Sequence, residues 1–195
     1  MKYIFFMGVL WFSCLLFASE SIKIHALHEE SFTCTEHWDG QFQHLGDALG
    51  TDCVIQEFVG EKGRYFMKSY ASNGFKNTDW FGYKKDVLAP CNCTIEKIHV
   101  NPVTNKPGIM TPGAASSIVL ITSDKTRVSL AHVDDIIVKV GQKVSAGEKI
   151  AKVGNNGYSR IPHTHVAAWK DDKPLQIQFD QKTLDLKERR NNSNN

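Results

Sequence analysis

Residues 138–157 read VKVGQKVSAGEKIAKVGNNG, and this stretch decides the fold class. It holds two short strands, in KVGQKV and in SAGEKIAKVG, and each is accompanied by a turn that contains glycine. This pattern is typical of a β-sandwich that turns tight corners. No window of ten or more residues in the chain has a convincing helical period, so we predict an all-β protein.

The sequence on either side of this stretch has the same character from about residue 85 onward. Runs rich in valine and isoleucine are separated by Gly, Pro, Asn and Asp at intervals of roughly 8–12 residues, which is typical of a compact antiparallel sandwich. A long loop of Gly, Pro and Asn at 101–116 is expected to form a functional rim. The runs are VLAP (87–90), CTIEKIHV (93–100), SSIVLIT (116–122), TRVSLAHV (126–133), IIVKV (136–140) and KIAKV (149–153).

The composition is that of an ordinary globular protein with one main domain. The chain has 195 residues, of which 42% are hydrophobic, and a formal net charge of +2. So small a charge excludes an electrostatic nucleic-acid binder, and the mean hydropathy of -0.30 excludes a polytopic membrane protein. We divide the chain into a signal peptide (1–18), an N-terminal extension (19–70), the β domain (71–180) and a disordered tail (181–195).

The first residues predict export. Residues 2–18, KYIFFMGVLWFSCLLFA, have a basic start, an apolar core and small residues at the exit, as in a signal peptide. An uncleaved N-terminal anchor is the alternative, because the run is near the lower limit for crossing a bilayer. We therefore expect a periplasmic, cell-envelope or extracellular protein with no other membrane association.

Export makes the cysteines candidates for disulfides. Removal of the signal takes away Cys14 and leaves Cys34, Cys53, Cys91 and Cys93. An even number in an exported chain suggests two disulfides. A ring between Cys91 and Cys93 would be tight, so we favour pairing of each with Cys34 or Cys53, which would staple the extension to the β domain. A metal site built on Cys-Asn-Cys is the rival interpretation.

Two histidines next to the decisive stretch could carry chemistry. His163 and His165 lie two residues apart in GYSRIPHTHVAAW (157–169), so on a strand their side chains share one face. One could ligate a metal while the other transfers protons. The alternative is two histidines exposed on a strand by chance. Four further histidines on a polar stretch are expected at the surface: His25, His28, His37 and His44.

Three motifs taken in order resemble peptidase family M23, the lysostaphin- and LytM-like zinc peptidases that cut peptidoglycan. The chain supplies LAHV (130–133), VKVGQKVSAGEKI (138–150) and GNNGYSRIPHTH (154–165). The resemblance covers about residues 75–170. It implies the compact antiparallel β-sandwich of that family, and an exported zinc endopeptidase that acts on peptidoglycan peptides.

The resemblance also implies roles for four residues. Asp79, in the stretch KNTDW, and His165 would be zinc ligands. His132 and His163 would line the water site, where they would orient the catalytic water, accept its proton and stabilise the oxyanion. In the family a histidine lies four residues before the aspartate, but this chain has Phe75 there, which cannot ligate a metal.

Phe75 leaves the implied zinc site with two protein ligands where catalytic sites normally have three. His99 could substitute only if the fold brought it to the site. A non-catalytic M23-like domain that binds cell-wall peptide or regulates another hydrolase is therefore the leading alternative, followed by an exported structural or adhesion module. A lipoyl- or biotinyl-type carrier is disfavoured, because Met67-Lys68 lies far upstream of the β core.

Overall fold

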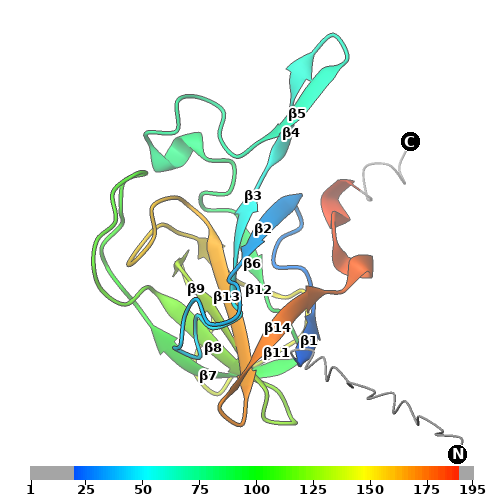
Figure 1. The fold of residues 1–195 in the computed structure, drawn as a ribbon, viewed down its shortest axis with the longest axis vertical. Coiled ribbons are helices and arrows are strands. Elements are labelled where there is room, and N and C mark those ends of the chain that lie inside the picture. Colours follow the sequence, from blue (N-terminus) through cyan, green and yellow to red (C-terminus); the bar gives the residue numbers. More distant parts are fainter. Residues whose placement is uncertain (1–19, 189–195) are drawn as a thin grey trace, which may run out of the picture.

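The computed structural model describes residues 20–188, so the predicted signal peptide lies outside the described residues. The regular structure of these residues is nearly all strand, with two short 3-10 turns and a helical stretch at 186–188, and the all-β prediction is confirmed (Figure 1). The strands are β1 (Ser21–Ile24), β2 (Phe32–Glu36), β3 (Thr51–Ile55), β4 (Glu57–Glu61), β5 (Arg64–Lys68), β6 (Asp86–Leu88), β7 (Cys93–His99), β8 (Ser117–Ile121), β9 (Arg127–Ala131), β10 (Val133–Asp134), β11 (Lys143–Val144), β12 (Lys149–Val153), β13 (Thr164–Lys170) and β14 (Lys173–Phe179). The turns are η1 (Asn77–Asp79) and η2 (Gln181–Thr183).

One large curled sheet forms most of the molecule. Its strand order is β1-β14-β13-β9-β8-β7-β11, and β2 and β3 join it through β13. β3 pairs with the first part of β13 and β14 pairs with the last part, while β9 runs along the other side. All of these pairs are antiparallel except β1 with β14, which is parallel. β13 is therefore the central strand around which the sheet is organised.

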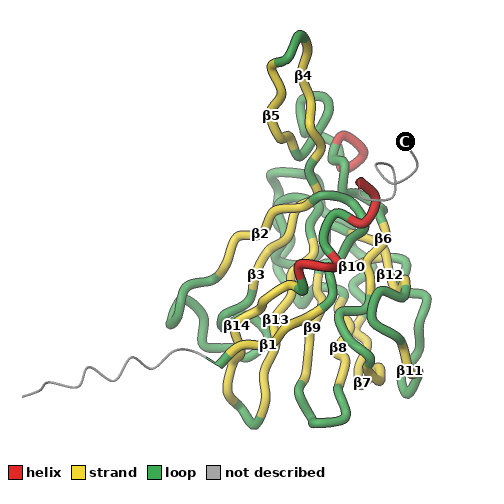
Figure 2. Tube along the Cα trace, turned by 90° about the vertical axis from the view of Figure 1, so that its right-hand side faces the viewer, coloured by secondary structure: helices red, strands yellow, loops and turns green. Residues whose placement is uncertain are grey.

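A small sheet completes a sandwich-like core. It has the order β10-β12-β6 and lies beside the large sheet (Figure 2). Val87 and Ile150 of the small sheet belong to the same buried cluster as Ile118, Leu130 and Val166 of the large one. The alternation of buried and half-buried residues in β8 is what a strand with one face on a core requires.

The region expected to be an N-terminal extension is part of the large sheet. β1 extends the sheet at β14, and β3 pairs with Thr164–Val166 of β13. Only β4 and β5 form a separate hairpin, which projects from one end of the molecule (Figure 1). The sequence gives little sign of these sheet strands, because they are short and separated by loops in a polar stretch. The expectation of a surface position is wrong for His28, which is fully buried and donates from Nδ1 to the Asp86 carbonyl at 2.9 Å.

The favoured disulfide pairing is wrong, although all four candidate cysteines are in disulfides. Cys34 is bonded to Cys53, and Cys91 is bonded to Cys93. Cys34 and Cys53 face each other in the register of β2 and β3, which brings their Cα atoms within 4.1 Å. Strand pairing, and not a covalent staple, joins the N-terminal strands to the rest of the sheet. The disulfide at Cys91 and Cys93 also takes both thiols of the rival metal site.

The first part of the predicted tail is ordered. Asp180 caps η2 by accepting the Lys182 N–H, and the Thr183 hydroxyl accepts the Ala26 N–H at 2.9 Å. Lys187 donates its N–H to the Glu29 carbonyl at 3.0 Å. These contacts hold residues 181–188 on the segment between β1 and β2, and 189–195 lie outside the described residues. Within 20–188, no helix is both long and apolar enough to cross a bilayer.

Candidate metal centre

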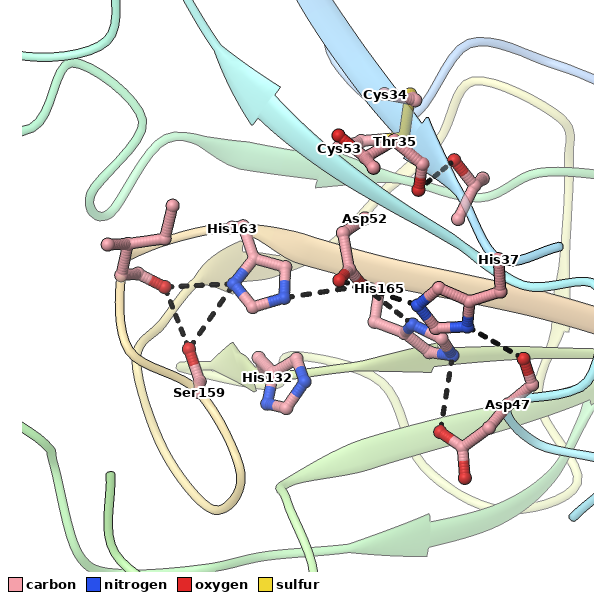
Figure 3. Close-up of polar contacts among 12 residues, drawn as sticks. Cys34, Thr35, His37, Asp47, Asp52, Cys53, His132, Ser159, His163 and His165 are labelled. Carbon is pink, nitrogen blue, oxygen red and sulfur yellow. Dashed lines mark hydrogen bonds and ion pairs between the residues drawn. A yellow bond between two sulfur atoms is a disulfide. The ribbon is translucent and has the colours of Figure 1, made fainter. Parts of the chain in front are cut away.

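The register of β13 explains why polar side chains converge at its start. His165 is paired with Asp52 of β3 on one side and with Ala131 of β9 on the other. His132 directly follows Ala131, and His163 directly precedes β13. Side chains at 163 and 165 share one face of the strand, because successive residues alternate. Figure 3 shows Asp52 among the imidazoles of His37, His163 and His165.

Three side chains are close enough to share one metal ion. The ligand atoms of His37, Asp52 and His165 all lie within 4.8 Å of one another. His165 Nδ1 is 2.8 Å from Asp52 Oδ1, and His37 Nε2 is 3.5 Å from Asp52 Oδ2. His37 and His165 thus approach different oxygens of this carboxylate. Two imidazoles and one carboxylate form a donor set that suits zinc, with a coordination position left open, so these residues fit a catalytic metal.

Backbone carbonyls of the segment before β3 fix the tautomers of the two imidazoles. His37 Nδ1 donates to the Asp47 carbonyl at 2.8 Å, and His165 Nε2 donates to the Gly46 carbonyl at 2.7 Å. Each ring therefore spends one N–H on an outer acceptor and directs its other nitrogen toward Asp52. Metal-binding histidines generally have such an outer acceptor, which orients the ring and raises its basicity.

The other two histidines are anchored in the same way. His163 Nδ1 donates to the Ile161 carbonyl at 2.8 Å, which leaves its Nε2 3.5 Å from Asp52 Oδ1. His132 Nδ1 donates to the Asn156 carbonyl at 2.8 Å, and its ring centroid is 4.5 Å from that of His163. His132 has a φ of +60°, a left-handed conformation that is rare for residues other than glycine.

Burial and the shared carboxylate set the charges in the cluster. Burial opposes ionisation of Asp52, but hydrogen bonds from His163 and His165 hold its pKa far below its usual range. Burial also opposes the charged form of His165, yet the bond to Asp52 raises its pKa above the ordinary value. Burial and the neighbouring His163 lower the pKa of His132 to about 3, so His132 is neutral at physiological pH. A metal ion would compete with a proton for His165 Nδ1.

Gly50 makes room for His165. A Cβ added at Gly50 would lie 2.7 Å from His165 Cε1 and 3.0 Å from the Asp47 carbonyl oxygen. We expect Gly50→Ala to displace the His165 ring and weaken zinc binding by about tenfold or more, as disturbance of ligand support generally does. A competition titration with a chromophoric chelator measures this.

Gly46→Ala is the matched control for this prediction. Its added Cβ would meet only the exposed His44 imidazole, at 3.1 Å, which can shift at the cost of its bond to the Gly46 N–H. Alanine keeps the backbone carbonyl that accepts from His165. Zinc affinity should therefore stay near the wild-type value. Equal losses in the two variants would show that the segment is sensitive to any added methyl group, and that contact with His165 is not the cause.

A cleft of about 820 Å³ opens beside the cluster. Its lining includes Phe42, Met110 of the 101–116 loop, and Tyr158. The prediction that this long loop forms a functional rim is in accord with that position. The loop also contributes three small residues to the lining, namely Gly113, Ala114 and Ala115.

The structure brings three of the four predicted site residues together. His132, His163 and His165 line the cleft, as the resemblance implies. Asp79 is not among the cleft-lining residues: it lies in η1, where its Oδ2 accepts the Lys76 N–H at 3.1 Å. His99, the suggested substitute, is also not among the lining residues. The structure thus gives neither residue a place in the cluster around His165.

His37 and Asp52 lie beside His165, where the sequence analysis expected Asp79 and considered His99. His37 was expected at the surface, but only 11% of its side chain is exposed. Asp52 was not considered, although it lies in the strand-like run TDCVI (51–55). Its position next to a disulfide cysteine was the one signal that could have drawn attention to it.

Comparison with known proteins points to one family. The sequence model of peptidase family M23 matches residues 78–177. An uncharacterized metalloprotease of Haemophilus influenzae is 33% identical over 79 residues, which are 40% of this chain and 15% of that protein. Another from Buchnera aphidicola is 43% identical over 44 residues, or 23% of this chain and 12% of that protein. The chain thus spans only a small part of the curated relatives it matches.

Two solved structures are also similar. The catalytic domain of lysostaphin from Staphylococcus simulans is 20% identical, with a TM-score of 0.41, over 78% of this chain and 86% of that one. A putative peptidase M23 from Pseudomonas aeruginosa is 15% identical, with a TM-score of 0.47, over 81% of this chain and 49% of that one.

Proposed function

The chain belongs to peptidase family M23, and we propose from this that it is an exported zinc endopeptidase that cuts peptides of peptidoglycan. A peptidase-type function and a metal follow from the family. Family membership alone does not establish that the metal is zinc, that the substrate is a wall peptide or that the protein is exported. These three points are our proposal. The signal-like residues 2–18 and the two disulfides support export, because disulfides persist in oxidising compartments.

The observation that best supports the proposal is the group of three possible metal-binding side chains at Asp52. Phe75 removes a ligand from the motif expected in the sequence, and its side chain is 75% exposed. His37, which directly follows β2, would supply the third donor instead. Three protein ligands are the usual number in a catalytic zinc site. A site rebuilt with three such ligands therefore favours an active enzyme over a non-catalytic domain without metal.

The chain's own residues can perform the proton transfers of amide hydrolysis. When bound, zinc would polarise the scissile carbonyl and lower the pKa of the attacking water. His163 directs its Nε2 away from a backbone acceptor, so it can take the proton of that water. His132 lies beside it with its own Nδ1 held by a backbone carbonyl, and burial keeps it neutral. The protonated imidazole then becomes a donor, which can stabilise the oxyanion and pass its proton to the leaving amine.

The cleft supports a peptide substrate that carries a carboxylate. Arg160 is the only lysine or arginine among its lining residues, and within residues 20–188 no acidic side chain lies within 4 Å of its guanidinium. A guanidinium without a carboxylate partner can accept one from a ligand. Peptidoglycan stem peptides carry free carboxylates, and the small residues at 113–115 leave space for their backbone.

Hydrolysis of defined wall peptides by the full exported chain tests the proposal. We expect cleavage of an internal amide that stops in excess chelator and returns when about one equivalent of zinc is added. His165→Ala should be inactive with or without zinc. Peptide binding that persists in chelator, without cleavage under any metal condition, would instead support a non-catalytic wall-binding domain.

A further inference from the structure

We propose that the Cys34–Cys53 disulfide is a positioning device for the metal centre, and that it acts by holding His37 against Asp52 and His165. The inference rests on the metal site of the proposed function and adds two residues to it. Neither cysteine could ligate the metal, since both sulfur atoms are in the bond. Their role would be to place a ligand that no local sequence motif supplies.

The strand that carries His37 to the site is weakly held. Among the described strands, β2 pairs with β3 alone. Thr33, Thr35 and Glu36 of this strand are exposed, and Phe32 is only partly buried. His37 follows the last residue of β2, after which the chain leaves the sheet. Strand ends with few buried contacts open readily, so backbone pairing alone would leave His37 poorly fixed.

The register places the disulfide next to the site. Cys34 is opposite Cys53, and the next pair along the ladder is Thr35 opposite Asp52. The His37 N–H then donates to the Gly50 carbonyl at 2.8 Å. A slip of β2 by one residue would turn every side chain to the other face of the sheet. The covalent bond forbids that slip at the ladder position beside Asp52.

The disulfide also closes a loop that contains most of the centre. The two cysteines are 19 residues apart in sequence. Between them lie the ligands His37 and Asp52 and the carbonyls of Gly46 and Asp47, which accept the outer N–H groups of the two imidazoles. A cross-link that closes such a loop reduces the number of conformations open to it without the metal. Pre-ordering of this kind increases affinity by lowering the cost of binding.

The second disulfide provides a matched comparison within the same chain. Cys91 and Cys93 are two residues apart, at the start of β7, and neither lines the cleft. Their bond encloses only Asn92, whose side chain accepts the Ala146 N–H. Removal of this disulfide should therefore leave the metal centre unchanged.

Zinc affinity of the two double variants tests the inference. In the full chain, we expect Cys34→Ala/Cys53→Ala to raise the zinc Kd about tenfold or more, and Cys91→Ala/Cys93→Ala to leave it near the wild-type value. In a His37→Ala background, the first pair of changes should have a smaller effect, because the part of the positioning that acts through His37 is already lost. The inference would be overturned if the cysteine changes raised the zinc Kd by the same factor in the His37→Ala protein as in the wild type. It would also be overturned if they left the Kd of the wild-type protein unchanged.

A second measurement needs no variant and so does not depend on how the cysteine variants fold. Coupling is reciprocal: if the disulfide favours zinc binding, zinc must favour the disulfide by the same factor. In glutathione buffers, two glutathione thiols are oxidised as Cys34 and Cys53 become thiols. We expect added zinc to raise the glutathione concentration needed for this reduction, measured by alkylation and mass spectrometry, and to leave Cys91–Cys93 unaffected.

An unmoved equilibrium at Cys34–Cys53 would contradict the inference. These experiments do not use peptide cleavage as a readout. A chain that cleaves no wall peptide, but whose zinc affinity depends on Cys34–Cys53 as described, would thus refute the proposed function and leave the positioning role intact.

Discussion

Replacement of Asp52 by asparagine is expected to abolish zinc binding at micromolar metal, together with peptidase activity. The Asp52 carboxylate faces His165 Nδ1 and His37 Nε2 with its two oxygens, and it is the one anionic ligand of the set. A neutral amide of the same shape preserves packing but removes the charge that holds the dication. Loss of a direct ligand should cost more than the about 100-fold that removal of an outer-sphere partner can cost. A competition titration measures the affinity.

Asp79→Asn is the control that distinguishes the structure from the sequence interpretation. Asp79 accepts the backbone N–H of Lys76 in η1 and does not line the cleft. Its substitution should leave zinc affinity within about twofold of the wild-type value, as is usual for surface changes that touch no ligand. A protein that loses zinc with Asp79→Asn and retains it with Asp52→Asn would refute the ligand assignment.

His163→Ala is expected to lower kcat on a wall peptide by about 10²–10⁴-fold while zinc remains bound. That range is the usual contribution of one general acid–base group. His163 Nε2 is directed toward the site, whereas its Nδ1 is held by the Ile161 carbonyl, so the substitution removes a proton acceptor and no member of the ligand set. Steady-state kinetics and metal analysis on the same sample separate the two effects.

His44→Ala serves as the control for His163→Ala. His44 also lines the cleft, but 82% of its side chain is exposed, and its Nδ1 accepts the Gly46 N–H. Its removal should change kcat by less than threefold. Loss of zinc from the His163→Ala protein would make His163 a ligand, and full activity of that protein would exclude it from the proton transfers.

The part of the site that lies close together in sequence was predictable. The alternation of a strand places His163 and His165 on one face, and the motif order adds His132. The structure agrees because β9 and β13 are neighbours, so that Ala131, next to His132, is opposite His165. The all-β class was also predictable, since short runs of valine and isoleucine alternate with glycine-containing turns and no window of ten or more residues has a convincing helical period.

His37 and Asp52 were not predictable from spacing because their relation is non-local. Asp52 reaches His165 through pairing of β3 with β13, across more than one hundred residues of sequence. His37 reaches Asp52 only because β2 pairs with β3 in one register. The interpretation that chose Asp79 relied on distance along the chain. The disulfide pairing was missed for the same reason, since the register of β2 and β3 is what sets Cys34 opposite Cys53.

The central claim is that His37, Asp52 and His165 hold one metal ion. The most direct test is a crystal of the zinc-loaded exported chain, with anomalous scattering recorded above and below the zinc absorption edge. We predict one strong peak within about 2.0–2.2 Å of His37 Nε2, an Asp52 carboxylate oxygen and His165 Nδ1. A peak that includes Asp79 or His99, or a zinc ion bound without His37, would contradict the account.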